Sequence, residues 1–306
     1  MFTKPLVVLA AIVAAVMATA AAVGVKLGSG ILHPYRKHLT ADEISVSTRR
    51  FVAMHAACSD FDVTALDGAK LRGWKVSAET PNGDWVVIFH GLGNNRLGQV
   101  GYAQFLLAHG YGALLMDSRA QGESGGDIGT YGWIERNDAK VIDDALLSGE
   151  PVRHLFYFGE SMGAAIALQA AAVDPRVDGV VAEDPFSNLR EETYDYAGLE
   201  FSPLLGKTLF RPAAIMALLQ AEKDGGFKAD YVSPEKAVAS RPFSVLLICG
   251  SEDHKIPCRH ARRIYERAIG PKELWIVRGA GHSMAYGVQH DEFERRVLNF
   301  YGTAAK

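Results

Sequence analysis

After about residue 60, short apolar runs alternate with longer stretches of helical character. Apolar runs of about four to eight residues bounded by Gly, Pro and Asp are typical of buried strands. Strands are predicted at residues 61–66, 70–76, 84–89, 112–116, 152–158, 177–182, 243–249 and 273–277, and helices at 98–109, 134–147, 161–173, 259–269 and 288–301. This alternation predicts an α/β fold with a mostly parallel, eight-stranded sheet and helices on both faces.

One interval, at about 185–240, breaks the alternation. It contains no strand pattern, and its composition is helical and aromatic. Long insertions between the elements of such a sheet often form a cap over a binding site. We therefore expect one domain, spanning residues 61–306, with a small helical cap inserted into it.

The stretch Gly159-Glu160-Ser161-Met162-Gly163 lies between a predicted strand and an Ala-rich predicted helix. A serine on such a tight turn is held in an exposed position, and the N-terminal end of the following helix favours negative charge beside it. Side chains in place of Gly159 and Gly163 would collide with nearby backbone. Because the pattern has the expected element on each side, it predicts that Ser161 is a nucleophile.

Two further polar residues follow later predicted strands, where open α/β sheets place their sites. Asp253 follows the strand at 243–249, and His282 lies in a loop of small residues after the strand at 273–277. A serine needs a base to take its proton, and imidazole can do so near neutral pH. An aspartate would orient the imidazole and stabilise its charged form. We predict a triad of Ser161, His282 and Asp253, with Glu252 as an adjacent alternative for the acid.

The loop after the strand at 84–89 begins His90-Gly91-Leu92-Gly93. Acyl transfer builds negative charge on a carbonyl oxygen, and fixed backbone N–H groups stabilise it. The expected donors are the amides of Met162, directly after the nucleophile, and of Leu92. Gly91 would let the backbone approach the substrate, whereas His90 is expected to be structural, with its ring bonded to the loop.

These features resemble the α/β-hydrolase superfamily, and most of all its serine aminopeptidase-like and prolyl-oligopeptidase-like branch with a hydrophobic N-terminal segment. The order Ser161, Asp253, His282 is the nucleophile–acid–base order of that fold. Residues 66–74 look like the opening hairpin of this branch, and 117–124 resembles its Asp-x-Arg-Gly-x-Gly-x-Ser loop, with alanine at position 120 in place of the usual glycine. The resemblance covers about residues 32–301 and implies an esterase, a peptidase or a thioesterase.

The expected function is a serine hydrolase that cleaves ester, thioester or amide bonds of small substrates through an acyl-enzyme, with carboxylesterase-like activity first. A serine peptidase or aminopeptidase, an acyltransferase, and a catalytically idle binding or scaffold protein remain as alternatives. The acidic residues Glu183, Asp184, Asp195 and Glu200 could bind a free amine and would then favour a peptidase. This chemistry requires no metal and no organic cofactor.

Composition limits the partners. The chain has 306 residues, of which 48% are hydrophobic and 22% charged, and its net charge is −3. No Lys/Arg-rich run is present, which argues against nucleic acid as a partner. The Gly-rich loops lack the spacing of dinucleotide or P-loop motifs. The expected partner is a small acyl or peptide-like substrate, and the oligomeric state is left open.

Three cysteines are too few to predict a disulfide framework. Cys249 and Cys258 flank the loop that carries Asp253, so a bridge between them is conceivable in an oxidising compartment. The simpler interpretation is that Cys249 is a small apolar residue at the end of a strand.

The N-terminal segment, residues 1–27, differs from the rest of the chain. Residues 6–25 carry no charge, a length that suits a bilayer-spanning helix. Residues 18–20, Ala-Thr-Ala, also resemble a signal-peptidase site. The sequence therefore predicts either a membrane anchor with the catalytic domain outside the cytoplasm or a cleaved signal of a secreted or periplasmic protein. Residues 28–60 are expected to be a linker and the approach to the sheet.

Overall fold

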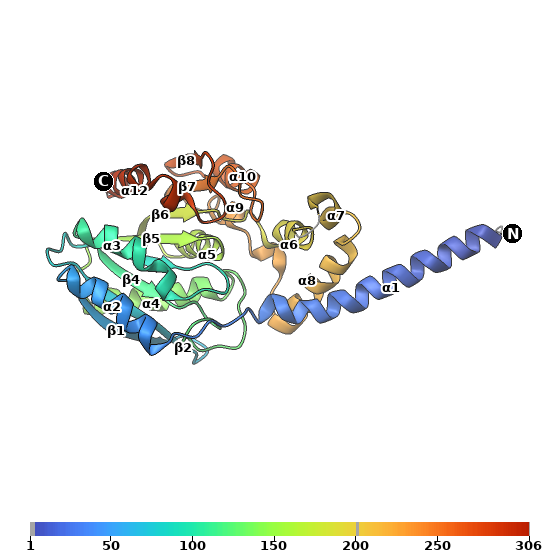
Figure 1. Cartoon of the computed structure of the whole chain (residues 1–306), viewed down its shortest axis with the longest axis horizontal. Coiled ribbons are helices and arrows are strands. Elements are labelled where there is room, and N and C mark those ends of the chain that lie inside the picture. The colour runs from blue at the N-terminus through green and yellow to red at the C-terminus, as the bar shows by residue number, and fades with distance from the viewer. Residues whose placement is uncertain (1–3, 200–201, 306) are drawn as a thin grey trace.

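Eight strands form one sheet in the order β1-β2-β4-β3-β5-β6-β7-β8. The computed structural model describes residues 4–199 and 202–305 (Figure 1). The strands are β1 (Ala57–Thr64), β2 (Lys70–Ser77), β3 (Asp84–Phe89), β4 (Gly112–Met116), β5 (His154–Glu160), β6 (Val177–Glu183), β7 (Ser244–Gly250) and β8 (Lys272–Val277). Strand β2 pairs antiparallel with β1 and β4, and all other pairs are parallel. The predicted α/β fold with a mostly parallel, eight-stranded sheet is confirmed.

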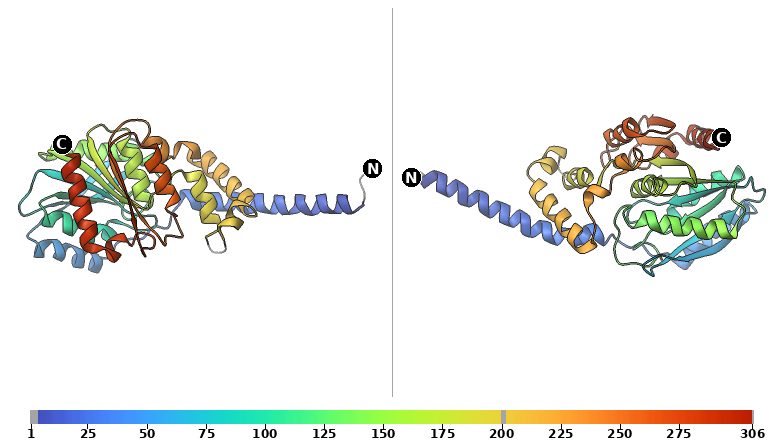
Figure 2. Two further views of the ribbon diagram at one scale, coloured as in Figure 1. Left: turned by 90° about the horizontal axis from the view of Figure 1, so that it is seen from above. Right: turned by 180° about the vertical axis from the view of Figure 1, so that it is seen from behind.

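Helices cover both faces of the sheet (Figure 2). One face packs against α2, α3 and α12, and the other against α4, α5 and α10. The helices are α1 (Lys4–Leu32), α2 (Ala41–Ala53), α3 (Val100–Ala108), α4 (Glu135–Gly149), α5 (Met162–Ala171), α6 (Leu189–Ala197), α7 (Pro203–Lys207), α8 (Arg211–Gly225), α9 (Pro234–Ala237), α10 (Arg259–Arg267), α11 (Ala285–Val288) and α12 (His290–Ala304), with 3-10 turns η1 (Arg96–Gln99) and η2 (Ala229–Tyr231).

The middle of each central strand is apolar because both faces of the sheet are buried there. In β3, Val86 and Ile88 join the core on one side of the sheet, and Val87 and Phe89 join the core on the other. Successive side chains of a strand point to opposite faces, so a strand between two helical layers has no polar face. This is the reason why continuous apolar runs, rather than alternating ones, predicted these strands.

Helix α2 lies within residues 28–60, which the sequence predicted to be a linker and the approach to the sheet. Thr40 and Glu43 form a capping box at its start, in which each side chain satisfies the other's backbone amide. Near its end, Phe51 is fully buried and meets the ring of Trp74 edge-on, with 6.4 Å between ring centroids. The Thr-x-x-Glu spacing was the available signal for this helix.

The interval at 185–240 holds α6, α7, α8, η2 and α9 and no strand among its described residues, as expected for a helical cap. The C-terminal half of α1 packs along α8 of this cap (Figure 1). The contact is close at Gly24, where a Cβ atom would lie 2.4 Å from the carbonyl oxygen of Ala213. Leu32, the last residue of α1, is fully buried in the core of the cap. The N-terminal helix is therefore partly built into the cap, and its other half extends away from the domain (Figure 2).

Among the residues that the structure describes, no helix combines the length and the apolar character needed to cross a membrane. The anchor and the cleaved signal stay predictions from the sequence.

Candidate active site

Ser161 lies at the turn between β5 and α5, in a strained backbone conformation with φ +54° and ψ −119°. The turn is tight enough to exclude side chains on either side of the serine. A Cβ atom at Gly163 would lie 2.1 Å from the carbonyl oxygen of Phe89, and one at Gly159 would lie 2.4 Å from the carbonyl carbon of Gly163. The Gly-x-Ser-x-Gly pattern therefore places the serine hydroxyl at the C-terminal edge of the sheet, directly before the start of α5.

His282 joins Ser161 to Asp253. Its Nε2 lies 2.9 Å from Ser161 Oγ, and its Nδ1 lies 2.7 Å from Asp253 Oδ2. With the proton on Nδ1, the ring donates to the carboxylate and Nε2 is free to accept the serine proton. The structure thus brings together the three residues that the sequence predicts as a triad, across 121 and 29 positions of the chain.

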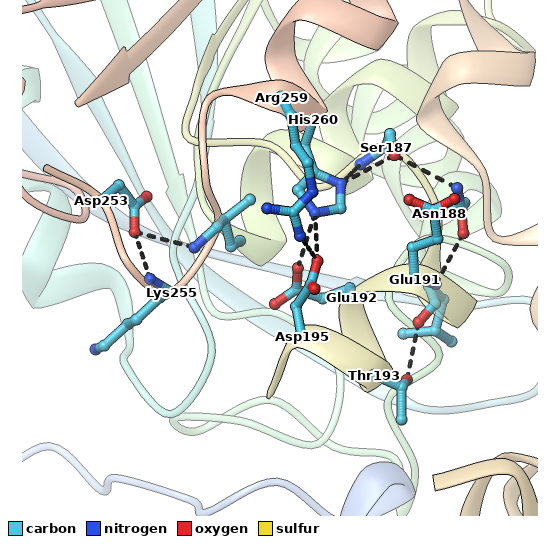
Figure 3. Close-up of polar contacts among 12 residues, drawn as sticks. Ser187, Asn188, Glu191, Glu192, Thr193, Asp195, Asp253, Lys255, Arg259 and His260 are labelled. Atoms are coloured by element: carbon cyan, nitrogen blue, oxygen red, sulfur yellow. Dashed lines mark hydrogen bonds and ion pairs between the residues drawn. The ribbon is translucent and has the colours of Figure 1, made fainter. Parts of the chain in front are cut away.

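The loop after β7 holds the Asp253 carboxylate in place. The backbone amides of Lys255 and Ile256 donate to Asp253 Oδ1 over 2.8 and 2.9 Å, which leaves Oδ2 for the histidine (Figure 3). The alternative acid, Glu252, is exposed, and its backbone amide donates to Ala280. Asp253, not Glu252, therefore faces the imidazole.

A second carboxylate, Asp184, lies beside the triad at the end of β6. Its Oδ2 is 4.0 Å from His282 Nδ1 and accepts the amide of Ser283 over 2.7 Å, while Oδ1 accepts the amide of Gly250 over 3.0 Å. Burial, and then the charge of Asp253, raise the pKa of Asp184 to about 7. Asp184 therefore ties the ends of β6 and β7 to the histidine loop. An acidic residue at the end of a predicted strand indicated that Asp184 could lie near the site, but which backbone amides it binds depends on the fold.

Glu183, the neighbour of Asp184, is fully buried on the other side of the strand. It accepts the amide of Ala285 and the hydroxyl of Tyr102, each over 3.0 Å. Burial, followed by the charges of Asp184 and Glu160, raises the pKa of Glu183 to about 8. This carboxyl group therefore keeps its proton at a pH where the unfolded chain has lost it.

Stability should consequently fall as the pH rises. Between about pH 4.5 and about 8 the folded chain holds a proton on Glu183 that the unfolded chain has released. The free energy of unfolding therefore declines through this window and levels off above it. Replacing Glu183→Gln should make the decline shallower, by up to about 1.4 kcal/mol per pH unit. Urea unfolding at pH 5, 6, 7 and 8 measures this slope. Glu79→Gln, an exposed control, should leave it unchanged, and an equal slope in the Glu183 variant would contradict the assignment.

The predicted oxyanion donors lie on the loop after β3, which carries Leu92, and at the first residue of α5, Met162. In the part of the chain that the structure describes, the backbone amides of Leu92 and Met162 donate to no acceptor. His90 is buried beside them, and its ring is bonded to the loop, as the sequence predicts. Its Nε2 accepts the amide of Ser118 over 2.9 Å, so its proton is on Nδ1, which donates to the carbonyl oxygen of Gly91 over 2.8 Å. Burial lowers the pKa of His90 and keeps the ring neutral.

The loop at 117–124 packs against these donors. Ala120, where the resembled family has glycine, lies in the left-handed region with φ +60°. A glycine would adopt this conformation without strain, which explains the family preference. The next residue, Gln121, points back toward the loop that carries Leu92 and accepts the amide of Gly93 over 2.6 Å.

Cys249 and Cys258 form a disulfide, with their Cα atoms 5.6 Å apart. The simpler interpretation of Cys249 as an unbridged apolar residue was therefore wrong. Cys249 lies near the end of β7 and Cys258 directly before α10, so the two ends of the loop between these elements lie close together. The bridge closes the loop that carries Asp253.

Removing this bridge should lower the free energy of unfolding. A loop of this length gains about 2–3 kcal/mol from cross-linking in the chain-entropy account. The double variant Cys249→Ser, Cys258→Ser should therefore unfold at lower urea concentration than the oxidised wild type, and Cys58→Ser should be close to wild type. Before reduction, the unfolded wild type should present a single reactive thiol. Three reactive thiols would refute the bridge.

A second histidine attaches the cap to the core (Figure 3). His260, on α10, accepts the amide of Ser187 at Nδ1 over 3.1 Å, so its Nε2 carries the proton and donates to Asp195 Oδ2 over 3.0 Å. Arg259 also pairs with Asp195, which lies on α6 of the cap. All of these groups except Arg259 are buried, so the network joins the cap to the loop region next to the acid. Sequence reasoning named Asp195 but not these partners.

This cluster is poorly suited to an additional cation. Glu192, Asp195 and His260 offer ligand atoms within 4.8 Å of one another. However, the Asp195 carboxylate already contacts two cationic side chains, Arg259 and Lys207, the latter at 3.1 Å. Because these cations already contact the Asp195 carboxylate, it is not free to bind the amine of a substrate. The carboxyl groups of Glu183 and Asp184 likewise accept hydrogen bonds from backbone amides. Glu200, the remaining acid considered for that role, lies outside the described residues.

Comparison with known proteins agrees with this geometry. The family model described as serine aminopeptidase, S33, matches residues 80–241. The chain is 30% identical to the uncharacterized protein YqkD of Bacillus subtilis, over 78% of each chain. It is 31% identical to polyketide transferase ATR5 of Stachybotrys chlorohalonatus, over 79% of this chain and 95% of that protein. Among solved structures, the Pyrococcus furiosus esterase Pf2001 superposes with a TM-score of 0.70 at 22% identity, covering 90% of this chain and 100% of that one.

Proposed function

The chain belongs to the serine aminopeptidase S33 family of α/β hydrolases, and on that basis we propose that it hydrolyses small carboxylic esters through an acyl-enzyme formed on Ser161. The observation that carries this proposal is the unbroken hydrogen-bonded chain from Ser161 through His282 to Asp253. A serine hydroxyl hydrogen-bonded to a base that itself has a fixed carboxylate partner has the arrangement of an activated nucleophile.

The proposed reaction proceeds in two halves. As Ser161 Oγ attacks the ester carbonyl carbon, its proton passes to His282 Nε2, and the carbonyl oxygen becomes negatively charged between the amides of Leu92 and Met162. The imidazolium, stabilised by Asp253, then gives the proton to the departing alcohol and leaves an acyl-serine. Water attacks this intermediate, loses a proton to His282, and releases the acid and the free serine.

We propose esters rather than peptides as substrates for a structural reason. The acids that could hold a free amine, Asp184 and Asp195 among them, are engaged by backbone amides or by arginine, lysine and histidine side chains. Esters also have the better leaving group and therefore demand less of the acid that protonates it. The description of the Pyrococcus furiosus neighbour as an esterase is in keeping with this choice.

Acyl transfer is the second candidate, because one relative is described as a polyketide transferase. In that reaction an alcohol or amine takes the place of water in the second half. The two activities differ in the product, since added alcohol would yield a new ester rather than the acid.

We also propose that the domain works in an oxidising compartment outside the cytoplasm. The disulfide between Cys249 and Cys258 supports this location, because such bridges persist where thiols are not kept reduced. Intact-mass analysis of protein isolated from its own cells would reveal both the first residue of the mature chain and the state of the two cysteines. A full-length chain with reduced cysteines, recovered from the cytoplasm, would contradict the proposal.

A fluorophosphonate probe and a series of p-nitrophenyl esters test the proposed activity. The full-length protein should be used, because the end of α1 contributes to the cap. Ser161 should be labelled by the probe, as located by peptide mass spectrometry, and short acyl esters should be hydrolysed faster than aminoacyl amides. A folded protein that neither reacts with the probe nor turns over any ester would exclude a serine hydrolase.

A further inference from the structure

We infer that Glu160 and Gln121 are positioning residues that hold the Leu92 amide in place from both sides. The inference rests on the proposed function, since it assigns the Leu92 amide to the oxyanion. The carbonyl oxygen of Gly91 is held by the His90 ring and by the amide of Asn94, but Leu92 itself lies between two glycines and is 43% exposed, so its own side chain does little to fix its amide. The direction of the Leu92 amide therefore depends on how the backbone amides of Gly91 and Gly93 are held.

Glu160 holds the residue before Leu92. Its Oε1 accepts the amide of Gly91 over 3.2 Å and the side-chain amide of Gln99 over 2.9 Å. Glu160 directly precedes the nucleophile and is buried, and this burial raises the pKa of its carboxyl group. The residue that precedes Ser161 thus fixes the start of the oxyanion loop to the nucleophile turn.

Gln121 holds the residue after Leu92. Its Oε1 accepts the amide of Gly93 over 2.6 Å, and its Nε2 lies 3.5 Å from the sulfur of Met162. The side chain is almost fully buried, at 1% residue exposure. It therefore contacts both the residue next to one proposed oxyanion donor and the side chain of the residue that supplies the other.

The two contacts have a common geometric consequence. The amides on either side of Leu92 are each held by a buried side chain, and the amide between them is left without an acceptor among the described residues. A donor that is fixed before the reaction stabilises developing charge without reorganisation at that moment. Displacement of such a group by about 1 Å can cost about 100-fold in rate.

The test removes each contact and follows kcat and KM separately. Gln121→Met and Glu160→Met keep the side-chain length but remove the oxygen acceptor, and each should lower kcat for a p-nitrophenyl ester about 10- to 100-fold with little change in KM. Glu160→Gln retains Oε1 as an acceptor and should restore kcat to within about threefold of wild type.

Gln169→Met is the matched control. Gln169 is also a buried glutamine, and its side chain hydrogen-bonds to Tyr131, Ala165 and Ser233, but it contacts no residue of the oxyanion loop. Its kcat should be unchanged. The inference is overturned if this control loses as much kcat as Gln121→Met, or if the Gln121 and Glu160 variants keep wild-type kcat.

Hydrogen exchange provides a readout that does not depend on activity. In the folded variants, the peptide spanning residues 90–97 should exchange faster in Gln121→Met and Glu160→Met than in wild type or Gln169→Met. Unchanged exchange in this peptide overturns the inference whatever the activity. If exchange rises but the wild type neither hydrolyses esters nor reacts with fluorophosphonate, it is the proposed function that fails, and the catalytic assignment of the loop fails with it.

Discussion

Replacing Ser161 with alanine is expected to lower kcat for ester hydrolysis by about three to six orders of magnitude. The variant retains the proposed oxyanion donors, the amides of Leu92 and Met162, but has no oxygen that can form the acyl-enzyme. Alanine shares the β-carbon of serine, so the strained φ of +54° at this position is no harder to adopt than in the wild type. Steady-state rates at saturating p-nitrophenyl acetate, together with loss of fluorophosphonate labelling, measure the effect.

Ser283→Ala is a suitable control for this experiment. Ser283 follows the predicted base and also has a positive φ, but its contact with Asp184 is made by the backbone amide. It should retain wild-type activity. If Ser161→Ala kept more than about one hundredth of the wild-type kcat, Ser161 would not be the nucleophile.

Replacing Asp253→Asn should lower kcat by about 10⁴-fold, the second largest effect that we expect. An asparagine amide that donates to Nδ1 would hold the wrong tautomer of His282, with the proton on the nitrogen that must accept from Ser161. The loop should remain folded, because the side-chain carbonyl oxygen of the asparagine can still accept the amides of Lys255 and Ile256. Rates measured across pH 6 to 9 would separate this loss from a simple shift of the pH optimum.

Asp184→Asn is the matched variant for this prediction. The Asp184 carboxylate lies 4.0 Å from His282 Nδ1, compared with 2.7 Å for Asp253. Because an asparagine at this position could still accept one of the two backbone amides, a loss of no more than about 10-fold is expected. A larger loss for Asp184→Asn than for Asp253→Asn would transfer the acid role to the residue after β6.

From the sequence, residues that follow the ends of parallel strands could be predicted better than polar contacts between elements far apart in the chain. Ser161, Asp253 and His282 each follow a recognisable apolar run, and parallel strands bring such positions to one edge of the sheet. The same logic placed Leu92 on the loop after β3, next to Ser161, and Met162 is the residue that directly follows Ser161. Their assignment to an oxyanion hole stays a prediction, but the proximity of Leu92 to Ser161 follows from the pairing of β3 with β5.

Supporting side chains could not be predicted in the same way. Gln121 and Glu160 lie in motifs that were recognised, yet their bonds to Gly93 and Gly91 join loops 28 and 69 positions apart. The pairing of His260 with Asp195 likewise depends on how the cap meets α10. Hydrophobic periodicity determines which face of an element is buried, but it carries no information on which polar groups meet between elements.

The disulfide and helix α2 were missed for different reasons. The proximity of Cys249 and Cys258 depends on the path of a loop, which spacing alone does not determine. Helix α2 had a local signal, the capping box between Thr40 and Glu43, but its mixed composition hid the apolar stripe that ends in Phe51.

The packing of α1 against α8 affects how this protein should be produced for assays. Cutting the chain after about residue 30, a natural choice for a segment that looks like a leader, would uncover the surface of α8 on which Gly24 and Gly28 rest. The cap of such a shortened enzyme would lose the helix that packs along α8 and would expose that flank to solvent. Substrate preferences recorded with it would describe the truncated cap, so acyl-chain selectivity is best compared between the trimmed and the intact polypeptide.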